Sequence, residues 1–469
     1  MKKNSQETEL KWYEKRQGIK PKQKQSQEIK REAAALKYRQ KEQDRKRQES
    51  YALRSRPQIS AEPKEVTAFR GECTGSLFDI NKVPLDAQKV IEEFDKVIDS
   101  THPLNSKQRA MLTKDIRVLS HYLTDERGER RLGYMNRTQT LSAYVHYYLW
   151  WNLVRLTRLF ASLPEDFFRL KDGSVCLDIG SGPLTVPLAL YLARSDLRNI
   201  KLTFYCMDIS KEALSIGENL FLTVASRLGG EPWKIIRVKG ELGTTIKDKS
   251  DLITCANVFN EIVQDNQMPP DYLAKKYTEK LLSYINSRKE DTAVLLIEPG
   301  VPQSSRFVSL MRDALMRKGY RPLSPCTHTW ECPMDGKKGG KWCNFAFSTQ
   351  DAPQSLKKLS ESSRLPKERA VLSFVASIYD SHLTDSGESE ADKDKTEDTH
   401  REDNRLSIRI ASDPIKLPGS RTGYYACSSK GLLLVITQTS LLSGQNIIIK
   451  NPKYAPETDS KSGALIVNI

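Results

Sequence analysis

The sequence lacks the features that would place this 469-residue chain in a membrane or make it a disulfide scaffold. No apolar run reaches the roughly 18 residues that a membrane span needs. Its eight cysteines are too sparse for a disulfide framework, and a reducing compartment keeps such residues as thiols. The opening stretch, MKKNSQETELKWYEKRQ, has neither the apolar core of a signal peptide nor the acid-poor composition of a mitochondrial presequence. We therefore expect a protein with no membrane partner in a cytoplasm of the bacterial type, and we favour the mitochondrial matrix less.

Charge is distributed unevenly along the chain, whose formal net charge is +15. Residues 1–56 hold 18 Lys/Arg and 8 Asp/Glu, whereas residues 382–404 hold 9 acids and 3 bases. Because residues 1–60 have few apolar side chains, we predict a basic arm that is largely disordered or a solvated helix, and an acidic disordered insertion at 382–404. A basic body with a basic arm favours a polyanionic partner such as nucleic acid; a solubilising tail is the alternative.

Hydrophobic periodicity divides the rest of the chain into three parts. Apolar residues recur at helical spacing over 84–170, which predicts an N-terminal helical domain. Over 171–323, β-rich runs alternate with helices; this pattern predicts an α/β fold with a doubly wound parallel sheet and a ligand site beyond the carboxyl ends of its strands. Over 324–450 the pattern predicts a small C-terminal β domain from the runs AVLSFVASIYD, RLSIRIASDPI, GYYACSSKGLLLVITQT and NIIIKN.

A glycine loop follows the first predicted strand in the segment LDIGSGPLTVPLAL. Asp178 ends the strand, and Gly180 and Gly182 allow a tight turn and a close approach to a ligand. About thirty residues later, Asp208 ends the second strand, where an acid can accept both hydroxyls of a ribose. The spacing D-x-G-x-G differs from the dinucleotide pattern and resembles motif I of class I S-adenosylmethionine-dependent methyltransferases. Leu184 stands where many of those enzymes have a third glycine.

The fourth predicted strand, DLITCANVFNEI, faces the methyl acceptor in such enzymes, and it has no DPPY or NPPY type of sequence. Cys255 lies inside its apolar run, which favours a buried structural thiol over a nucleophile. Asn257, Asn260 and Glu261 are placed to meet cofactor or substrate, or alternatively to cap the following helix. The sequence shows no convincing general base, so catalytic residues are left unassigned.

A polar, glycine-broken segment, PCTHTWECPMDGKKGGKWCNF, contains Cys326, Cys332 and Cys343. The intervals between them are not the paired C-x-x-C of common zinc sites. Cys427, in SRTGYYACSSKG, is a candidate fourth ligand. Four thiolates suit an iron–sulfur cluster that ties the two segments together. A Cys/His zinc site that uses His328 and a set of unligated thiols are the alternatives.

Several segments together resemble one family, the methyltransferase-like assembly factors of the mitochondrial small ribosomal subunit and their bacterial relatives. They are LDIGSGP, NVFNEI, LLIEPGVPQSSRF, PC…CPM…WCNF, SFVASIYD and RTGYYACSSKG, and the resemblance runs from about 110 to 440. It implies a class I methyltransferase-like fold that acts on small-subunit ribosomal RNA in assembly or translation. We expect a monomer when free.

The resemblance also implies two sets of site residues. Those expected at S-adenosylmethionine are Asp178, Gly180, Ser181, Gly182, Asp208 and Asn257. Those expected at a 4Fe-4S cluster, with zinc as the alternative, are Cys326, Cys332, Cys343 and Cys427. We thus expect an rRNA methyltransferase. A non-catalytic RNA-binding assembly factor and a zinc-containing RNA methyltransferase are the alternatives.

Overall fold

The computed structural model describes residues 71–124, 134–263, 268–286, 291–337, 340–381, 405–418 and 421–469. All of them lie in the second of two units into which the chain divides, Ala68–Ile469. The expected basic arm at 1–60 and the acidic insertion at 382–404 lie outside the described residues. Within the described ranges, no helix combines the length and apolar character that crossing a bilayer requires.

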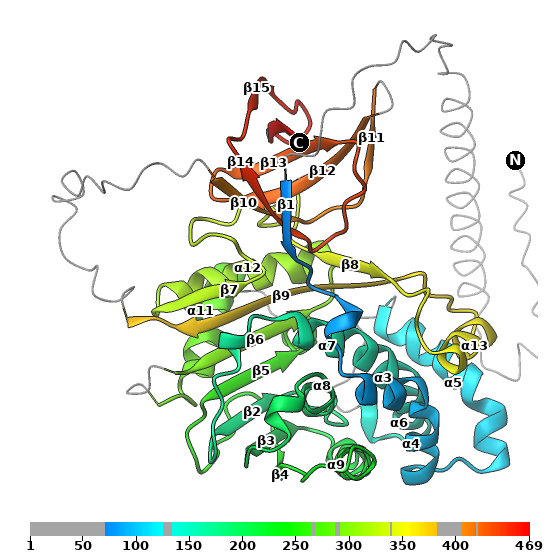
Figure 1. The fold of residues 1–469 in the computed structure, drawn as a ribbon. Helices are drawn as coiled ribbons and strands as arrows, with labels where there is room; N and C mark the ends of the chain where they lie inside the picture. Colours follow the sequence, from blue (N-terminus) through cyan, green and yellow to red (C-terminus); the bar gives the residue numbers. More distant parts are fainter. Residues whose placement is uncertain are drawn as a thin grey trace, which may run out of the picture. The chain divides into compact units, whose positions relative to one another are not determined.

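The larger sheet has the strand order β4-β3-β2-β5-β6-β9-β7, and β8 pairs with β9 (Figure 1). Strands β2 to β6 run parallel, whereas β9 is antiparallel to both of its neighbours, β6 and β7. This confirms the predicted doubly wound sheet. The strands are β2 (Val175–Ile179), β3 (Thr203–Asp208), β4 (Lys234–Lys239), β5 (Leu252–Ala256), β6 (Ala293–Glu298), β7 (Tyr320–Ser324), β8 (Phe345–Ser348) and β9 (Arg369–Tyr379).

Helices cover both faces of this sheet, because its central strands are apolar on both sides. Successive residues of a strand point to opposite faces, so Cys176 of β2 joins one core cluster and Leu177 joins another. Helices α8 and α9 pack on the first face, and α10 to α12 pack on the second. Their bounds are α8 (Thr185–Ala193), α9 (Lys211–Arg227), α10 (Phe259–Ile262), α11 (Pro270–Leu282) and α12 (Pro302–Met316).

The helices that precede the sheet form a layer against α8 and α9. Their buried side chains belong to the same core cluster as those helices, so this expected helical domain shares its core with the sheet. The segment η4 is a π-helix, a wide turn that often occurs at functional sites. The bounds are α3 (Leu85–Glu92), α4 (Phe94–Thr101), α5 (Ser106–Thr124), η3 (Tyr134–Asn136), α6 (Thr138–Ala143), η4 (Tyr144–Leu149) and α7 (Trp150–Ser162).

A second sheet also has eight strands, and we call it the smaller sheet because its strands contain fewer residues in total. It has the order β1-β14-β10-β12-β13-β16-β15, with β11 paired to β12, and has its own apolar core. Its strands are antiparallel except for the pair β13 and β16. The bounds are β1 (Gly71–Gly75), β10 (Arg405–Ile410), β11 (Ile415–Leu417), β12 (Arg421–Ser428), β13 (Gly431–Thr437), β14 (Asn446–Lys450), β15 (Tyr454–Thr458) and β16 (Leu465–Asn468).

The two sheets do not contain the same strands as the sequence predicted for them. The run AVLSFVASIYD was expected in the C-terminal β domain, but it forms β9 of the larger sheet. Seven consecutive residues of β9 are buried, which is the pattern of a strand covered on both faces. The smaller sheet also recruits β1 from the beginning of the described chain and extends beyond residue 450 to β16.

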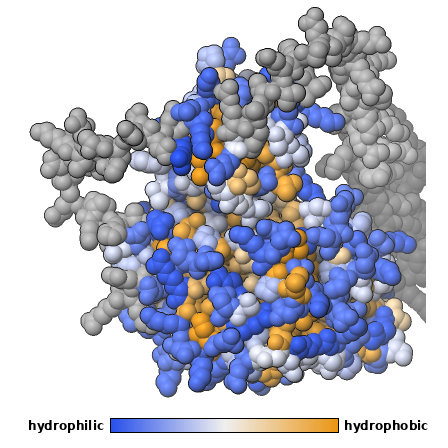
Figure 2. Space-filling view, viewed as in Figure 1, coloured by the Kyte–Doolittle hydropathy of each residue, from blue (hydrophilic) through white to orange (hydrophobic). Residues whose placement is uncertain are grey.

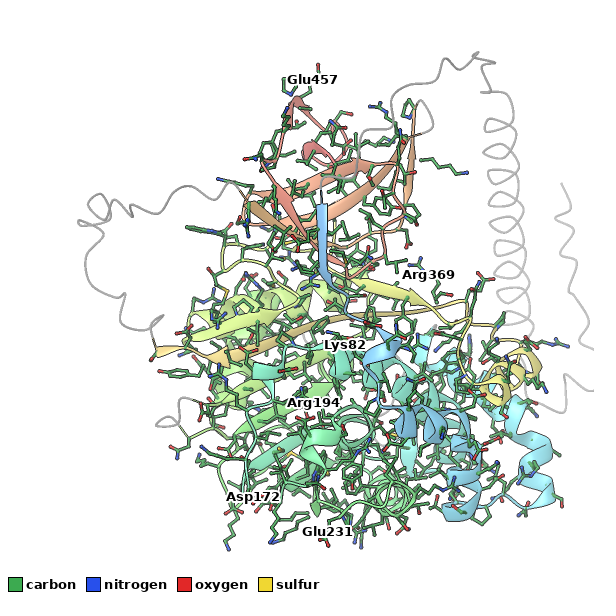
Figure 3. All side chains as sticks on the ribbon, viewed as in Figure 1. Lys82, Asp172, Arg194, Glu231, Arg369 and Glu457 are labelled. Carbon is green, nitrogen blue, oxygen red and sulfur yellow. The ribbon has the colours of Figure 1, made fainter. Side chains whose placement is uncertain are left out.

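Polar contacts join the two sheets. Arg369, at the start of β9, forms an ion pair with Asp413, which lies between β10 and β11; Arg369 is labelled in Figure 3. Arg409 of β10 donates to the carbonyl of Pro325, which directly follows β7 (3.1 Å). On the face shown in Figure 2, hydrophilic residues predominate and apolar residues form small groups.

Candidate cofactor site and cysteine cluster

A cavity opens at the carboxyl ends of β2, β3 and β5. It is the position that the doubly wound pattern predicts for a ligand. The cavity is lined by Met135, Tyr144, Ile179, Gly180, Gly182, Asp208, Ile209, Gly240, Glu241, Leu242, Ala256, Asn257, Val258, Glu261 and Ile262.

Gly180 begins the loop between β2 and α8, and only glycine fits there. Its φ of 69° is left-handed, and a Cβ at this position would lie 2.4 Å from Cγ2 of Val258. The amides of Gly180 and Ser181 both donate to the carbonyl of Met207 in β3, at 2.8 and 3.0 Å. The loop is therefore fixed to the neighbouring strand while its backbone faces the cavity.

Asp208 binds the same loop from the end of β3. Its Oδ2 accepts from the amide of Gly182 (2.9 Å), and its Oδ1 accepts from the amide of Ser210 (2.8 Å). Burial raises the pKa of Asp208, and these hydrogen bonds oppose the increase. Each carboxylate oxygen can accept more than one hydrogen bond, so the group retains acceptor capacity toward the cavity.

Asp178 and Ser181 lie beneath the loop and are not among the residues that line the cavity. The carboxylate of Asp178 accepts hydrogen bonds from the hydroxyls of Ser181 (2.5 Å) and Thr254 (2.6 Å). Burial raises its pKa to about 7, although both hydroxyls act in the opposite direction. This arrangement ties the loop to β5, so Asp178 positions the loop from below.

Leu184, which replaces a glycine common in such loops, keeps the backbone that a glycine would adopt. It precedes α8 with φ 56°, its side chain is fully buried, and it does not line the cavity. The left-handed conformation costs a non-glycine residue about 1–2 kcal/mol. Gly217 of α9 provides the space, since a Cβ there would lie 2.7 Å from Cδ1 of Leu184. Leucine in place of glycine at position 184 thus leaves the cavity open.

The residues after β5 divide between two cavities. Asn257, with φ 59°, and Glu261 line the cavity described above. Asn260 instead lines a smaller cavity beside Glu298, where its Oδ1 is buried without a hydrogen-bond partner among the described residues. Glu298 accepts from the amides of Phe259 (2.7 Å) and Asn260 (3.1 Å), and burial raises its pKa to about 8.

Two cavity residues from the N-terminal helical layer were not predicted from the sequence. Met135 of η3 and Tyr144 of η4 cover the cavity, and Cε of Met135 lies 3.7 Å from the position of a Cβ on Gly182. Burial raises the pKa of Tyr144, as do the nearby charges of Glu261 and Asp208. Helical spacing of apolar residues predicts the helices here but not which residues face a ligand.

The structure brings Cys326, Cys332, Cys343 and Cys427 together. The first three lie in the loop between β7 and β8, and Cys427 lies in β12 of the smaller sheet. Burial raises the pKa of Cys343, and the charges of Cys332, Cys326 and Cys427 raise it further. Cys427 likewise has a pKa raised first by burial and then by Cys326 and Cys332. The four thiols are therefore close enough to interact electrostatically.

Basic groups contact this cysteine cluster. The Nε of Arg312, a buried residue of α12, donates to Sγ of Cys326 (3.2 Å). The same guanidinium donates to the carbonyls of His328 (3.1 Å) and Trp330 (2.8 Å). Nε2 of His328 lies 3.1 Å from Sγ of Cys427. Arg312 thus holds the cysteine loop against the helix that follows β6.

Among the described residues, no group of three or more His, Cys, Asp or Glu side chains, those of the cysteine cluster included, is arranged to hold a metal ion.

The fold and the cavity together define the class of protein. When β8, which pairs only with β9, is left out of the numbering, the strands of the larger sheet have the order 3-2-1-4-5-7-6 along the chain, and the seventh strand is antiparallel. This order, the D-x-G-x-G loop and the acid that ends the second strand are those of the class I methyltransferase fold.

Comparison with protein families identifies the group within this class. Residues 155–386 match the family described as "Mitochondrial small ribosomal subunit Rsm22". Over these residues, just under half of the chain, the protein is similar to this family, and they include the glycine loop, Asp208 and the cysteines of the β7–β8 loop.

Solved structures similar to this chain include methyltransferases. One is precorrin-6y C5,15-methyltransferase from Geobacter metallireducens, at 12% identity over 54% of this chain and 94% of that chain, with a TM-score of 0.27. Another, from Geobacter sulfurreducens, is a SAM-dependent methyltransferase in complex with S-adenosyl-L-homocysteine, at 16% identity over 49% and 90%, with a TM-score of 0.24. Comparison with curated proteins gave no match.

Proposed function

We propose that the chain binds S-adenosylmethionine in the cavity at the carboxyl ends of β2, β3 and β5. The observation that carries this proposal is the coincidence of the cavity with the glycine loop and Asp208. Asp208 would accept the ribose hydroxyls, and the apolar side chains of Ile209 and Leu242 offer surfaces for the adenine ring. Asn257 and the backbone at Gly180 would complete the contacts.

We propose small-subunit ribosomal RNA as the partner, in ribosome assembly or translation. The family's description names the mitochondrial small ribosomal subunit, and the formal charge of +15 suits a polyanion. The protein would be found where its ribosome is. We retain the bacterial-type cytoplasm, and the family's description favours the mitochondrial matrix as the alternative.

We propose a 4Fe-4S cluster held by Cys326, Cys332, Cys343 and Cys427. The proximity of these thiols supports it, as do the guanidinium of Arg312 and the imidazole of His328 beside two of the sulfurs. Bound there, the cluster would join the β7–β8 loop to the smaller sheet. Because such a site forms only when both segments are folded, cluster binding contributes to folding.

The cluster is tested by metal analysis after anaerobic purification. We expect brown protein with about four irons and four sulfides per chain, and loss of the colour in Cys427→Ser. Cys73→Ser is the matched control, since Cys73 of β1 is an exposed thiol. Stoichiometric zinc in place of iron would contradict the proposal and favour the zinc-containing alternative.

Two versions of the function differ in whether methyl transfer occurs. Bound S-adenosylmethionine would supply an electrophilic methyl group. In the enzymatic version the protein's own contribution is to orient the acceptor in line and to exclude water, with Tyr144 and Met135 covering the cavity. In the alternative version, the fold is an RNA-binding platform whose affinity comes from phosphate contacts.

An rRNA modification map separates these two versions. We expect a methyl mark on small-subunit rRNA that disappears when the gene is deleted and returns with the wild-type gene. An unchanged map, together with loss of assembled small subunits, would contradict the enzymatic version and support the platform.

A further inference from the structure

A lysine lies among three aromatic rings beside the cofactor cavity. Lys367 is an exposed residue between α13 (Gln354–Ser362) and β9. Its Nζ lies 5.7 Å from the ring centre of Tyr147, 5.8 Å from that of Tyr148 and 5.3 Å from that of Trp151. At these distances the rings attract an ammonium group.

The loop that carries Lys367 is held in place by two of these rings. The hydroxyl of Tyr147 donates to the carbonyl of Leu365 (3.0 Å), and Nε1 of Trp151 donates to the hydroxyl of Ser360 (3.2 Å). Both aromatic side chains are buried, whereas Tyr148 is only partly buried. The backbone that carries Lys367 is therefore held against the core, and the ring of Tyr148 stays partly exposed.

Arg155 of α7 is a second cation, and its guanidinium donates to the carbonyl of Val371 (3.1 Å) and to Oδ1 of Asn152 (2.8 Å). Among the described residues, its buried Nε has no hydrogen-bond partner. Burial lowers the pKa of Arg155 to about 10. Although Lys367 as a whole is exposed, desolvation of its amino group among the three rings, and then the charge of Arg155, lowers the pKa of Lys367 to about 8. Two neighbouring cations repel each other, and an anion bound between them would offset this repulsion.

The aromatic surface is continuous with the cofactor cavity. The rings of Tyr144 and Tyr148 stack with centres 5.8 Å apart and an interplanar angle of 24°. Tyr144 lines the cavity, and the charge of Arg155 acts on both Tyr144 and Glu298. The π-helical turn η4 supplies Tyr144, Tyr147 and Tyr148 to this surface.

We propose that Lys367, Arg155, Tyr148 and Tyr144 form an RNA subsite next to the cofactor cavity. A backbone phosphate binds between the two cations, and a base of a single-stranded segment stacks on Tyr148. Cations interleaved with aromatic faces are the arrangement that single-stranded RNA uses, whereas an acidic peptide needs no stacking surface. This inference rests on the proposed function, and it names the surface that seats the RNA.

The test compares binding of transcribed small-subunit rRNA to full-length variants over a range of salt. One lost phosphate contact on single-stranded RNA lowers the slope of log K against log salt by about 0.7. If Lys367→Gln and the wild type bind equally at 1 M salt, this change in slope makes the variant bind about fivefold more weakly than the wild type at 0.1 M salt. Lys367→Arg should restore both values, and Tyr148→Leu should weaken binding at all salt concentrations.

Lys234→Gln is the matched control, because Lys234 is exposed at the start of β4, at the opposite end of the strand from the cavity. The subsite is supported if Lys367→Gln binds S-adenosylmethionine with wild-type affinity and has a reduced salt slope for the rRNA. Lys234→Gln should not show the reduced slope. The same affinity and slope in Lys367→Gln as in the wild type would overturn it while leaving the proposed function intact. Failure of the wild type to bind the rRNA would overturn both.

Discussion

Replacing Gly217 by alanine should test whether the packing of α9 against the glycine loop controls the cofactor site. On propensity alone, alanine inside a helix is favoured over glycine by about 1 kcal/mol. The added Cβ, however, would lie 2.4 Å from the carbonyl carbon of Pro183 and 2.7 Å from the amide nitrogen of Leu184. Backbone atoms cannot rotate away as a side chain can, so the loop or the helix must move by about 1 Å to reach ordinary contact.

The two opposing energies, overpacking and helix propensity, decide whether Gly217→Ala stabilises or destabilises the protein. Overpacking of a core costs about 1–3 kcal/mol, which exceeds the gain from helix propensity. We expect Gly217→Ala to lower the free energy of unfolding by up to about 2 kcal/mol. Because the displaced loop forms one wall of the cavity, we also expect at least about tenfold weaker binding of S-adenosylmethionine, equivalent to about 1.4 kcal/mol.

Urea unfolding and titration calorimetry measure these two quantities. Ser226→Ala is the control, because Ser226 is exposed on the same helix, and the change improves helix propensity without a clash. A Gly217→Ala variant that is more stable than the wild type and binds the cofactor equally well would refute the reasoning.

Two further predictions concern the same loop. Asp178→Asn should remove part of the pH dependence of stability: the folded-state pKa of about 7 lies above the usual 3.8, so the stabilising contribution is complete below pH 3.8 and is lost as pH rises through 7. The loss amounts to at most about 4 kcal/mol, and parallel unfolding profiles of both proteins from pH 4 to 8 would contradict it. Leu184→Gly relieves about 1 kcal/mol of backbone strain but removes a buried side chain worth about 3–5 kcal/mol, so denaturant unfolding should show a net loss of stability. Its cofactor affinity should fall less than that of Gly217→Ala, because glycine can keep the left-handed backbone, and an equal or greater fall would show that reasoning to be wrong.

Local sequence patterns predict the parts of the site that depend on the backbone. Gly180 needs a left-handed backbone and space for Val258, and Asp208 ends a strand beside it; both features are visible as spacing along the chain. The doubly wound sheet is equally visible, because its strands and helices alternate. These predictions succeed because neighbouring residues determine the conformation.

Features that depend on tertiary packing escape the same reasoning. β9 follows the cysteine segment and is close in sequence to the strands of the smaller sheet, yet burial on both faces places it beside β6. Met135 and Tyr144 are ordinary apolar or aromatic positions in helical segments until those segments pack over the cavity. The buried Nε of Arg155, which has no hydrogen-bond partner among the described residues, becomes evident only when its surroundings are known. No periodicity within one segment reports contacts between distant segments.

Binding of S-adenosylmethionine to the purified protein tests the central claim most directly. Calorimetric titration should give about one site per wild-type chain. Gly180→Ala should abolish binding, because its Cβ would lie 2.4 Å from the side chain of Val258. Gly173→Ala, with the same kind of left-handed φ and nothing within 4 Å of the added Cβ, should bind as the wild type does. Absence of binding by the wild type, or equal binding by Gly180→Ala, would contradict the account.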